Sequence, residues 1–166
     1  MPGRVVQIFL APAAGAPAVA VPSARAVAGQ GLEGDRYAAG EGSFSRWPGP
    51  ARDLTLIAAE ALADAADEFG VEMADGEHRR NVVVEGLDLR AVTGGEITIG
   101  DVRLAVVRAC APCKYLVRVT GQDRAFDALV GRGGVRCAIL TDGVFSVGDA
   151  IAIDAASLTR RRHLPG

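Results

Sequence analysis

Short apolar runs and alternating apolar and polar residues extend along most of this chain, a pattern typical of β-strands. "RVVQIFLA" (4–11) predicts a first strand. Further strands are predicted by the β-branched runs in "NVVVEG", "EITIGDVRLAVVRA", "KYLVRV" and "VRCAILTDGVFSVGDAIAI". Gly100-Asp101 and Asp142-Gly143 separate such runs, and each pair predicts a hairpin turn.

The segment "DLTLIAAEALADAADEFG" changes from the pattern of a strand to the residue spacing of a helix. It predicts a strand at Leu54–Ile57 and then a helix at Ala59–Phe69, with Gly70 as its C-terminal stop. The Pro- and Gly-rich residues 12–22 predict a loop with a short extended piece at Ala18–Val21. The expected fold class is therefore mostly β (α+β), a β-barrel or sandwich with peripheral helices. We expect a single domain over residues 1–155 and a solvated tail over 156–166.

Composition narrows the class of protein. The 166 residues are 49% hydrophobic, enough for one core without disulfides. No apolar run approaches the roughly 20 residues that cross a bilayer, and the first apolar stretch is interrupted by three prolines, unlike a secretory leader. We therefore expect a cytoplasmic protein without a membrane partner. The net charge of −2 argues against a nucleic-acid partner, which needs a concentrated basic surface.

Two of the three cysteines lie in "RACAPCKYLVRVTG" (108–121). A zinc site usually needs about four ligands, and the remaining candidates, Cys137, His78 and His163, are scattered. A thioredoxin-like dithiol uses a helix after the second cysteine, whereas "KYLVRV" has the composition of a strand. Both readings are therefore disfavoured.

A third reading is that the cysteines are small buried apolar residues. This suits Cys137, in the alternating "RCAILT". It suits Cys110 and Cys113 less well, because nearby cations such as Arg108 and Lys114 favour a thiolate. A thiolate in a cationic pocket suits a soft metal centre that carries an anionic organic ligand. Such a centre also needs groups that bind an anion.

Three further stretches carry arginines that suit this role. "GLEGDRY" places Arg36 after two glycines, "EHRRNVVV" places Arg79 and Arg80 before a strand, and "LVGRGGVR" surrounds Arg132 with glycines. Successive backbone N–H groups in such a loop can form an anion nest, and the planar guanidinium pairs with phosphate in a way that lysine cannot reproduce. No P-loop, dinucleotide fingerprint or nucleophile elbow is present.

Taken in order, the chain resembles one family, the MOSC domain, named for the C-terminal region of molybdenum cofactor sulfurases. The motifs that carry the resemblance are "GLEGDRY", "LTLIAAEAL", "HRRNVVVEGLDL", "TGGEITIGDVRL", "RACAPC" and "DGVFSVGDAIAI". It covers about residues 7–154, so the chain looks like a stand-alone MOSC protein with a β-barrel fold and helices around it. The resemblance also implies binding of the molybdenum cofactor, a pterin dithiolene phosphate that carries molybdenum.

In reductases of this family a cysteine similar in position to Cys113 coordinates the metal, and cofactor-contacting arginines match Arg36 and the Arg79–Arg80 pair, with Asn81 closing the motif. The resemblance thus implies a reductase of small N-hydroxylated substrates that takes electrons from a separate protein, because no flavin or haem site is evident. No pyridoxal phosphate site is expected.

Two alternatives remain at this stage: a sulfur carrier that forms a cysteine persulfide from a sulfur-donor protein, and a MOSC fold without cofactor. The candidate metal ligand and catalytic residue is Cys113, and the candidate cofactor-binding residues are Arg36, Arg79, Arg80, Asn81, Lys114, Arg132 and Gly133.

Overall fold

The computed structural model describes residues 3–13, 15–36, 52–112 and 114–162, and the side chains of residues up to 158. Its strands are β1 (Gly3–Leu10), β2 (Val19–Val21), β3 (Ser23–Val27), β4 (Gly31–Leu32), β5 (Leu54–Ala58), β6 (Val82–Glu85), β7 (Glu96–Ile99), β8 (Val102–Ala109), β9 (Val135–Ile139), β10 (Gly143–Ser146) and β11 (Ala150–Asp154). Its helices are α1 (Ala59–Phe69), α2 (Leu89–Val92), α3 (Tyr115–Thr120), α4 (Ala125–Leu129) and α5 (Ala155–Arg162).

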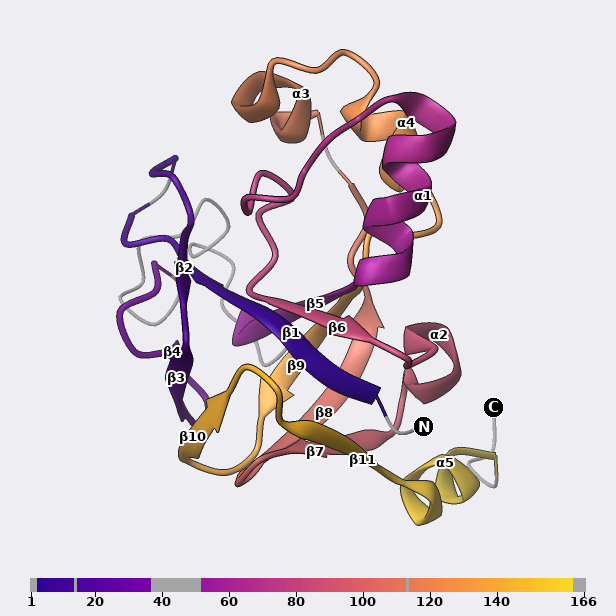
Figure 1. Ribbon diagram of the computed structural model, residues 1–166. Helices are drawn as coiled ribbons and strands as arrows, with labels where there is room; N and C mark the ends of the chain where they lie inside the picture. The colour runs from indigo at the N-terminus through magenta and orange to yellow at the C-terminus, as the bar shows by residue number, and fades with distance from the viewer. Residues whose placement is uncertain (1–2, 14, 37–51, 113, 163–166) are drawn as a thin grey trace.

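The described strands form a closed β-barrel in the order β11-β7-β8-β9-β5-β6-β1 (Figure 1). The barrel closes where β1 pairs with β11, with Gly3 opposite Ile151. The β5–β6 pair is parallel and the other barrel pairs are antiparallel. Strand β2 pairs with the C-terminal end of β1. Strands β10, β3 and β4 form a small second sheet. The expected mostly-β barrel with peripheral helices is confirmed.

The barrel interior is the main hydrophobic core. Alternation along β8 turns Val102, Leu104 and Val106 inward, where they meet inward residues of the other strands. A second cluster lies outside the barrel, where α1, α3 and α4 cover outward-facing Ile57 and Val83. Figure 1 shows these three helices gathered at one side of the barrel. The nearly continuous burial of β5 and β6 follows, because both of their faces are covered.

Helix α1 has the predicted bounds, and Gly70 ends it with φ 65°, the left-handed conformation that glycine adopts without strain. The Gly100-Asp101 turn also joins β7 to β8 as predicted. The predicted Asp142-Gly143 hairpin is wrong, because β10 pairs with β3 instead of β9. Both edges of β9 are already occupied by β8 and β5, so β10 has no free edge of β9 to pair with.

The predicted strand "KYLVRV" is wrong, since α3 occupies this segment. Leu116 is fully buried against Ala125 and Leu129 of α4, and Gly121 ends the helix with φ 66°. Tertiary packing therefore overrides the β-propensity of the valines. The argument that disfavoured a thioredoxin-like dithiol, the absence of a helix after Cys113, was accordingly incorrect, although α3 is only six residues long.

Helix α5 occupies most of the predicted tail. It packs on the barrel through Ser157, which is buried and whose Oγ accepts a hydrogen bond from the Glu96 amide at 2.8 Å. Ser157 is therefore an anchored residue and not part of a solvated tail. Among the described residues, no helix combines the length and the apolar character needed to span a bilayer.

A close approach of backbones at the start of β9 generates a prediction. A Cβ at Gly134 would lie 1.9 Å from the Leu56 carbonyl oxygen, whereas one at Gly148 would meet nothing within 4 Å, although both residues have φ near 90°. We expect Gly134→Ala to lower the free energy of unfolding by more than about 3 kcal/mol and Gly148→Ala by only about 1 kcal/mol. Urea unfolding measures both; equal losses would show that φ alone, and not the close approach, sets the cost.

Candidate functional site

The segment before β6 has an unusual backbone. Arg79 has φ 66°, the single positive φ found at a non-glycine residue in the described part of the chain. His78 stabilises this conformation, because its Nδ1 accepts the Arg80 amide at 2.9 Å. His78 is completely buried and stacks edge-on against Phe9, with ring centroids 5.4 Å apart. Burial, together with the charges of Arg80 and Arg79, lowers the pKa of His78 to about 3, so the imidazole is neutral.

Hydrogen bonds from Arg36 and Arg79 link the loops that contain Arg36, Arg79 and Ala16. Arg36 is 7% exposed; its Nη1 lies 3.3 Å from Asp35 Oδ1 and its Nη2 donates to the Arg79 carbonyl at 3.4 Å. Arg79 in turn donates to the carbonyl of Ala16. A Cβ at neighbouring Gly15 would lie 3.6 Å from the Tyr115 hydroxyl, at the first residue of α3. These arginines therefore lie beside the chain that follows the CAPC motif.

Arg80 reaches in a different direction. Its Nε donates to the Gly133 carbonyl at 2.8 Å and its Nη1 to the His78 carbonyl at 3.1 Å. Gly133 is itself pressed against Cys110, since a Cβ there would lie 2.3 Å from the Cys110 carbonyl oxygen. On the other side, Arg90 of α2 donates to the Gly131 carbonyl. The glycine loop that was predicted to form an anion nest thus presents two carbonyls to two arginines.

Asn81 and Arg132, two predicted cofactor residues, make internal contacts. The Asn81 Oδ1 accepts from Thr55 Oγ1 at 3.2 Å and its Nδ2 donates to the Phe9 carbonyl at 3.3 Å. Arg132 points toward α1, where its Nη2 pairs with Glu68 at 2.9 Å and its guanidinium lies 5.8 Å from the ring centroid of Phe69. Arg132 is therefore directed to α1, whereas Arg36 contacts the Arg79 carbonyl and Arg80 contacts the Gly133 carbonyl.

The two cysteines that the structure describes, Cys110 and Cys137, are both buried. Cys110 is 2% exposed and its amide donates to the Gly134 carbonyl at 2.8 Å, which holds the end of β8 to β9. Cys137 is fully buried in the barrel core, as predicted, and burial and neighbouring Cys110 raise the pKa of its thiol. Cys113, the predicted metal ligand, lies outside the described residues. Lys114, which follows it, is exposed at the start of α3.

Sequence reasoning missed a polar row on the outer face of the barrel. Arg108 of β8 lies directly opposite Arg136 of β9, and Arg136 lies opposite Thr55 of β5. Thr55 bonds to Asn81 at the start of β6. Directly paired residues point to the same side of a sheet, and the neighbouring Val135 and Cys137 face the core, so this row faces outward. The signal was present: Arg136 alternates with core residues in "GVRCAI".

Two further observations bear on the chemistry. No group of three or more His, Cys, Asp and Glu side chains suited to a metal occurs within the described ranges. Asp53, two residues before Thr55, is buried and its Oδ2 accepts the Ile139 amide at 2.9 Å. Burial raises the pKa of Asp53, and this hydrogen bond opposes the increase.

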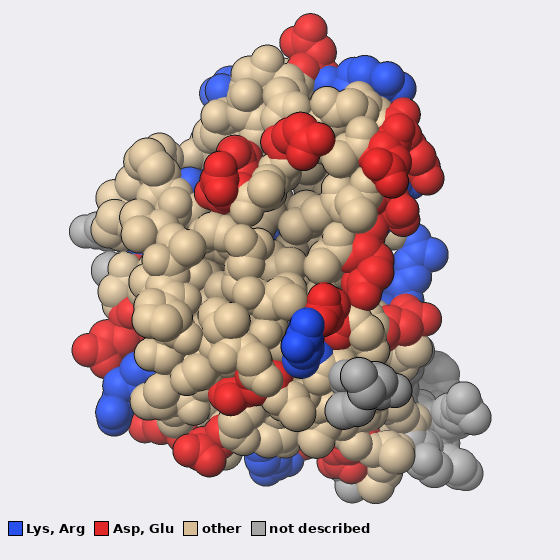
Figure 2. All heavy atoms as spheres, viewed as in Figure 1, with Lys and Arg blue, Asp and Glu red and all other residues tan. Residues whose placement is uncertain are grey.

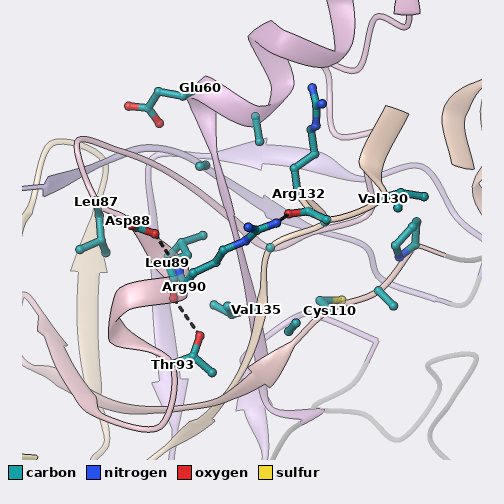
Figure 3. Close-up of a pocket in the computed structure, with 18 of the residues that line it drawn as sticks. Glu60, Leu87, Asp88, Leu89, Arg90, Thr93, Cys110, Val130, Arg132 and Val135 are labelled. Atoms are coloured by element: carbon teal, nitrogen blue, oxygen red, sulfur yellow. Dashed lines mark hydrogen bonds between the residues drawn. The ribbon is translucent and has the colours of Figure 1, made fainter. Parts of the chain in front are cut away.

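A cavity of about 660 Å³ lies at the barrel end and is lined in part by the Cys110 segment. Figure 3 shows Cys110 and Val130 at one end, Leu87, Asp88 and Leu89 at the other, and Arg90 extended between them. Val135, Leu87 and Leu89 also belong to the barrel core, so the cavity is the open mouth of the barrel. Arg36, Arg79 and Arg80 do not line it.

Comparison with known proteins identifies the family. The model of the MOSC domain matches residues 45–152. The chain belongs to the MOSC domain family. The family is associated with the molybdenum cofactor in general.

Solved MOSC structures share the fold. YuaD from Bacillus subtilis superposes with a TM-score of 0.74 at 18% identity, covering 92% of this chain and 96% of that one. YiiM from Geobacillus stearothermophilus gives 0.70 at 16% identity over 92% of this chain and 75% of that one, and YiiM from Escherichia coli gives 0.68 at 18% identity over 98% and 79%. At these identities the likeness concerns the fold alone. No curated protein sequence matches the chain significantly.

The buried histidine generates a pH prediction. Its pKa is about 3 in the folded protein against 6.5 ordinarily, so between these values the unfolded chain binds one more proton. Stability contributed by neutral His78 is therefore complete above about pH 6.5 and is lost as the pH falls toward 3, with a slope of about 1.4 kcal/mol per pH unit. His78→Asn retains an acceptor for the Arg80 amide but does not titrate. Urea unfolding at about pH 7, 6 and 5 should show a shallower loss for the variant, and parallel curves would contradict this.

Proposed function

We propose that this MOSC protein binds the molybdenum cofactor on the outer barrel face beside Cys110, with Cys113 as metal ligand, and reduces small N-hydroxylated compounds with electrons from a separate protein. The bound metal would supply two-electron transfer to the substrate. The chain itself would hold the anionic pterin phosphate, position the metal-ligating thiolate and admit the substrate.

The proposal rests on contacts between arginine-bearing segments that lie far apart in the sequence. Arginines from segments far apart in sequence are linked in one series of contacts: Arg36 to the Arg79 carbonyl at 3.4 Å, then Arg80 to the Gly133 carbonyl at 2.8 Å. Gly133 touches Cys110, three residues before Cys113. Cationic side chains with a planar fork, gathered near a thiolate, are what a phosphate-bearing metal cofactor requires.

Arg108 of β8 supports the same ligand. Among the described residues, the Arg108 side chain has no hydrogen-bond or ion-pair partner, and Arg108 is exposed. A phosphate beside Arg108 would gain a charge-assisted contact, and Arg108 would also favour the thiolate form of a nearby cysteine. The residues present thus fit the cofactor.

The first test measures metal content. Protein from a host that makes the cofactor should contain molybdenum, and Cys113→Ala should lose most of it because the metal–sulfur bond is removed. Cys110→Ala is the matched control, since Cys110 is the other cysteine of the motif, and it should retain molybdenum. Elemental analysis measures both. Wild-type protein without molybdenum would contradict the proposal, and a mass increase of about 32 Da on a cysteine in that protein would favour the sulfur-carrier alternative.

The second test addresses the polar row. We expect Arg108→Gln to lower the pterin phosphate retained after purification by about tenfold, since one charge-assisted contact of roughly 1.5 kcal/mol is removed. Arg103→Gln is the control: it lies on the same strand but forms an ion pair with Glu96. Release of phosphate from the denatured protein measures the content. Equal retention in all three proteins would show that the row does not hold the cofactor.

A further inference from the structure

The cavity at the barrel mouth differs in chemistry from the outer face. Its walls are mainly aliphatic or aromatic groups from α1, α2, the Cys110 segment and the glycine loop. The apolar lining includes Ala61, Leu87, Pro112, Phe126 and Val130. A volume of about 660 Å³ lies within the roughly 300–1,000 Å³ of small-molecule sites in proteins. The cavity is therefore large enough for an organic molecule and is mostly apolar.

The polar side chains that line the cavity already have protein partners. The Asp88 carboxylate accepts the Arg90 amide at 3.0 Å and caps α2, and Glu60 accepts the Gly86 amide at 2.8 Å. Thr93 Oγ1 donates to the Leu89 carbonyl at 2.8 Å. The Arg90 guanidinium donates to the Gly131 carbonyl, as Figure 3 shows. These groups stabilise the walls, and a bound molecule would meet chiefly apolar surface.

The charges around the cavity balance. Its lining holds two carboxylates, Glu60 and Asp88, and two guanidinium groups, Arg90 and Arg132, of which Arg132 is paired with Glu68. Helix α1, which forms one wall, carries four acidic residues and no basic one in its sequence AEALADAADEF. Figure 2 shows acidic side chains gathered along this helix. An anion or a cation would therefore lose hydration among apolar groups without a net opposite charge in the lining.

We propose that this cavity binds the uncharged, apolar ring portion of the substrate. The identification of the occupant as substrate rests on the proposed function, whereas binding of such a ring to the cavity does not. Cys110, Ala111 and Pro112 form one wall and lead directly into Cys113. The segment that leads to the predicted metal ligand therefore lines an apolar cavity suited to an uncharged ring.

The test uses three probes of the same size on protein without cofactor: benzamide, benzoate and benzylamine. Two-dimensional amide NMR should show benzamide shifting resonances of Leu87, Leu89 and Val130, while benzoate and benzylamine bind about tenfold or more weakly because a charge must be desolvated. No benzamide shifts in the wild-type protein would overturn the proposal. Binding of either ion as tight as that of benzamide would overturn the assigned ligand class.

Matched variants localise the binding. Ala61 lines the cavity and Ala63 lies exposed on the same helix. Ala61→Phe should weaken benzamide by about tenfold or more by filling the space, and Ala63→Phe should leave the affinity within about twofold. Val130→Asp provides a second variant at a position 55% exposed, where a charge is tolerated in the fold, with Val119→Asp as its control on α3. Unchanged affinity in both cavity variants would overturn the proposal.

A final measurement separates the two proposals. In protein loaded with molybdenum, Ala61→Phe should raise KM for an aromatic N-hydroxylated substrate by about tenfold without lowering the molybdenum content. Absence of molybdenum from the wild-type protein would contradict the proposed function, but it would not affect the benzamide result. Full molybdenum with an unchanged KM would overturn the assignment of the cavity to the substrate.

Discussion

The site depends on a close approach of backbones at Gly133 and Gly134. Cβ atoms at these positions would lie 2.3 Å from the Cys110 carbonyl oxygen and 1.9 Å from that of Leu56, so no other residue fits without moving the chain. This contact holds the start of β9 against both β5 and the end of β8. The Gly134 carbonyl then accepts the Cys110 amide, and Arg80 binds the Gly133 carbonyl. The CAPC segment is thereby anchored at the barrel rim.

Two environments with different electrostatics meet at this rim. Outside the barrel, Arg108, Arg136, Thr55 and Asn81 form a row across four neighbouring strands, and Arg36 and Arg79 lie in the loops beside it. At the mouth, the apolar core continues into the cavity. Burying guanidinium groups is costly unless they are hydrogen-bonded, and Arg36, Arg79 and Arg80 each bond to a backbone carbonyl. Their positions are consequently fixed by the fold before any ligand binds.

Local patterns predicted elements best where packing and propensity agree. Alternation located β1 and β8, and helical spacing with Gly70 gave α1 its correct bounds. Propensity failed at Tyr115–Thr120, because burying Leu116 against α4 stabilises a helix in a segment rich in valine. The hairpin prediction at Asp142-Gly143 failed for a different reason. An Asp-Gly pair indicates that the chain reverses direction, but it does not indicate which strand the next strand pairs with, and β10 pairs with β3.

The sequence by itself determined the fold class, the burial of Cys137 and the family, since these follow from local periodicity and ordered motifs. It also identified arginine as the residue type for an anion. Only the tertiary structure decided which partners each arginine contacts. Arg36 contacts the Arg79 backbone and Arg80 turns to Gly133. Arg132 turns to Glu68 on α1, and Arg108 lies opposite Arg136 on the neighbouring strand. The reason is physical: strand neighbours and register are set by pairings between distant segments, which no local window of sequence contains.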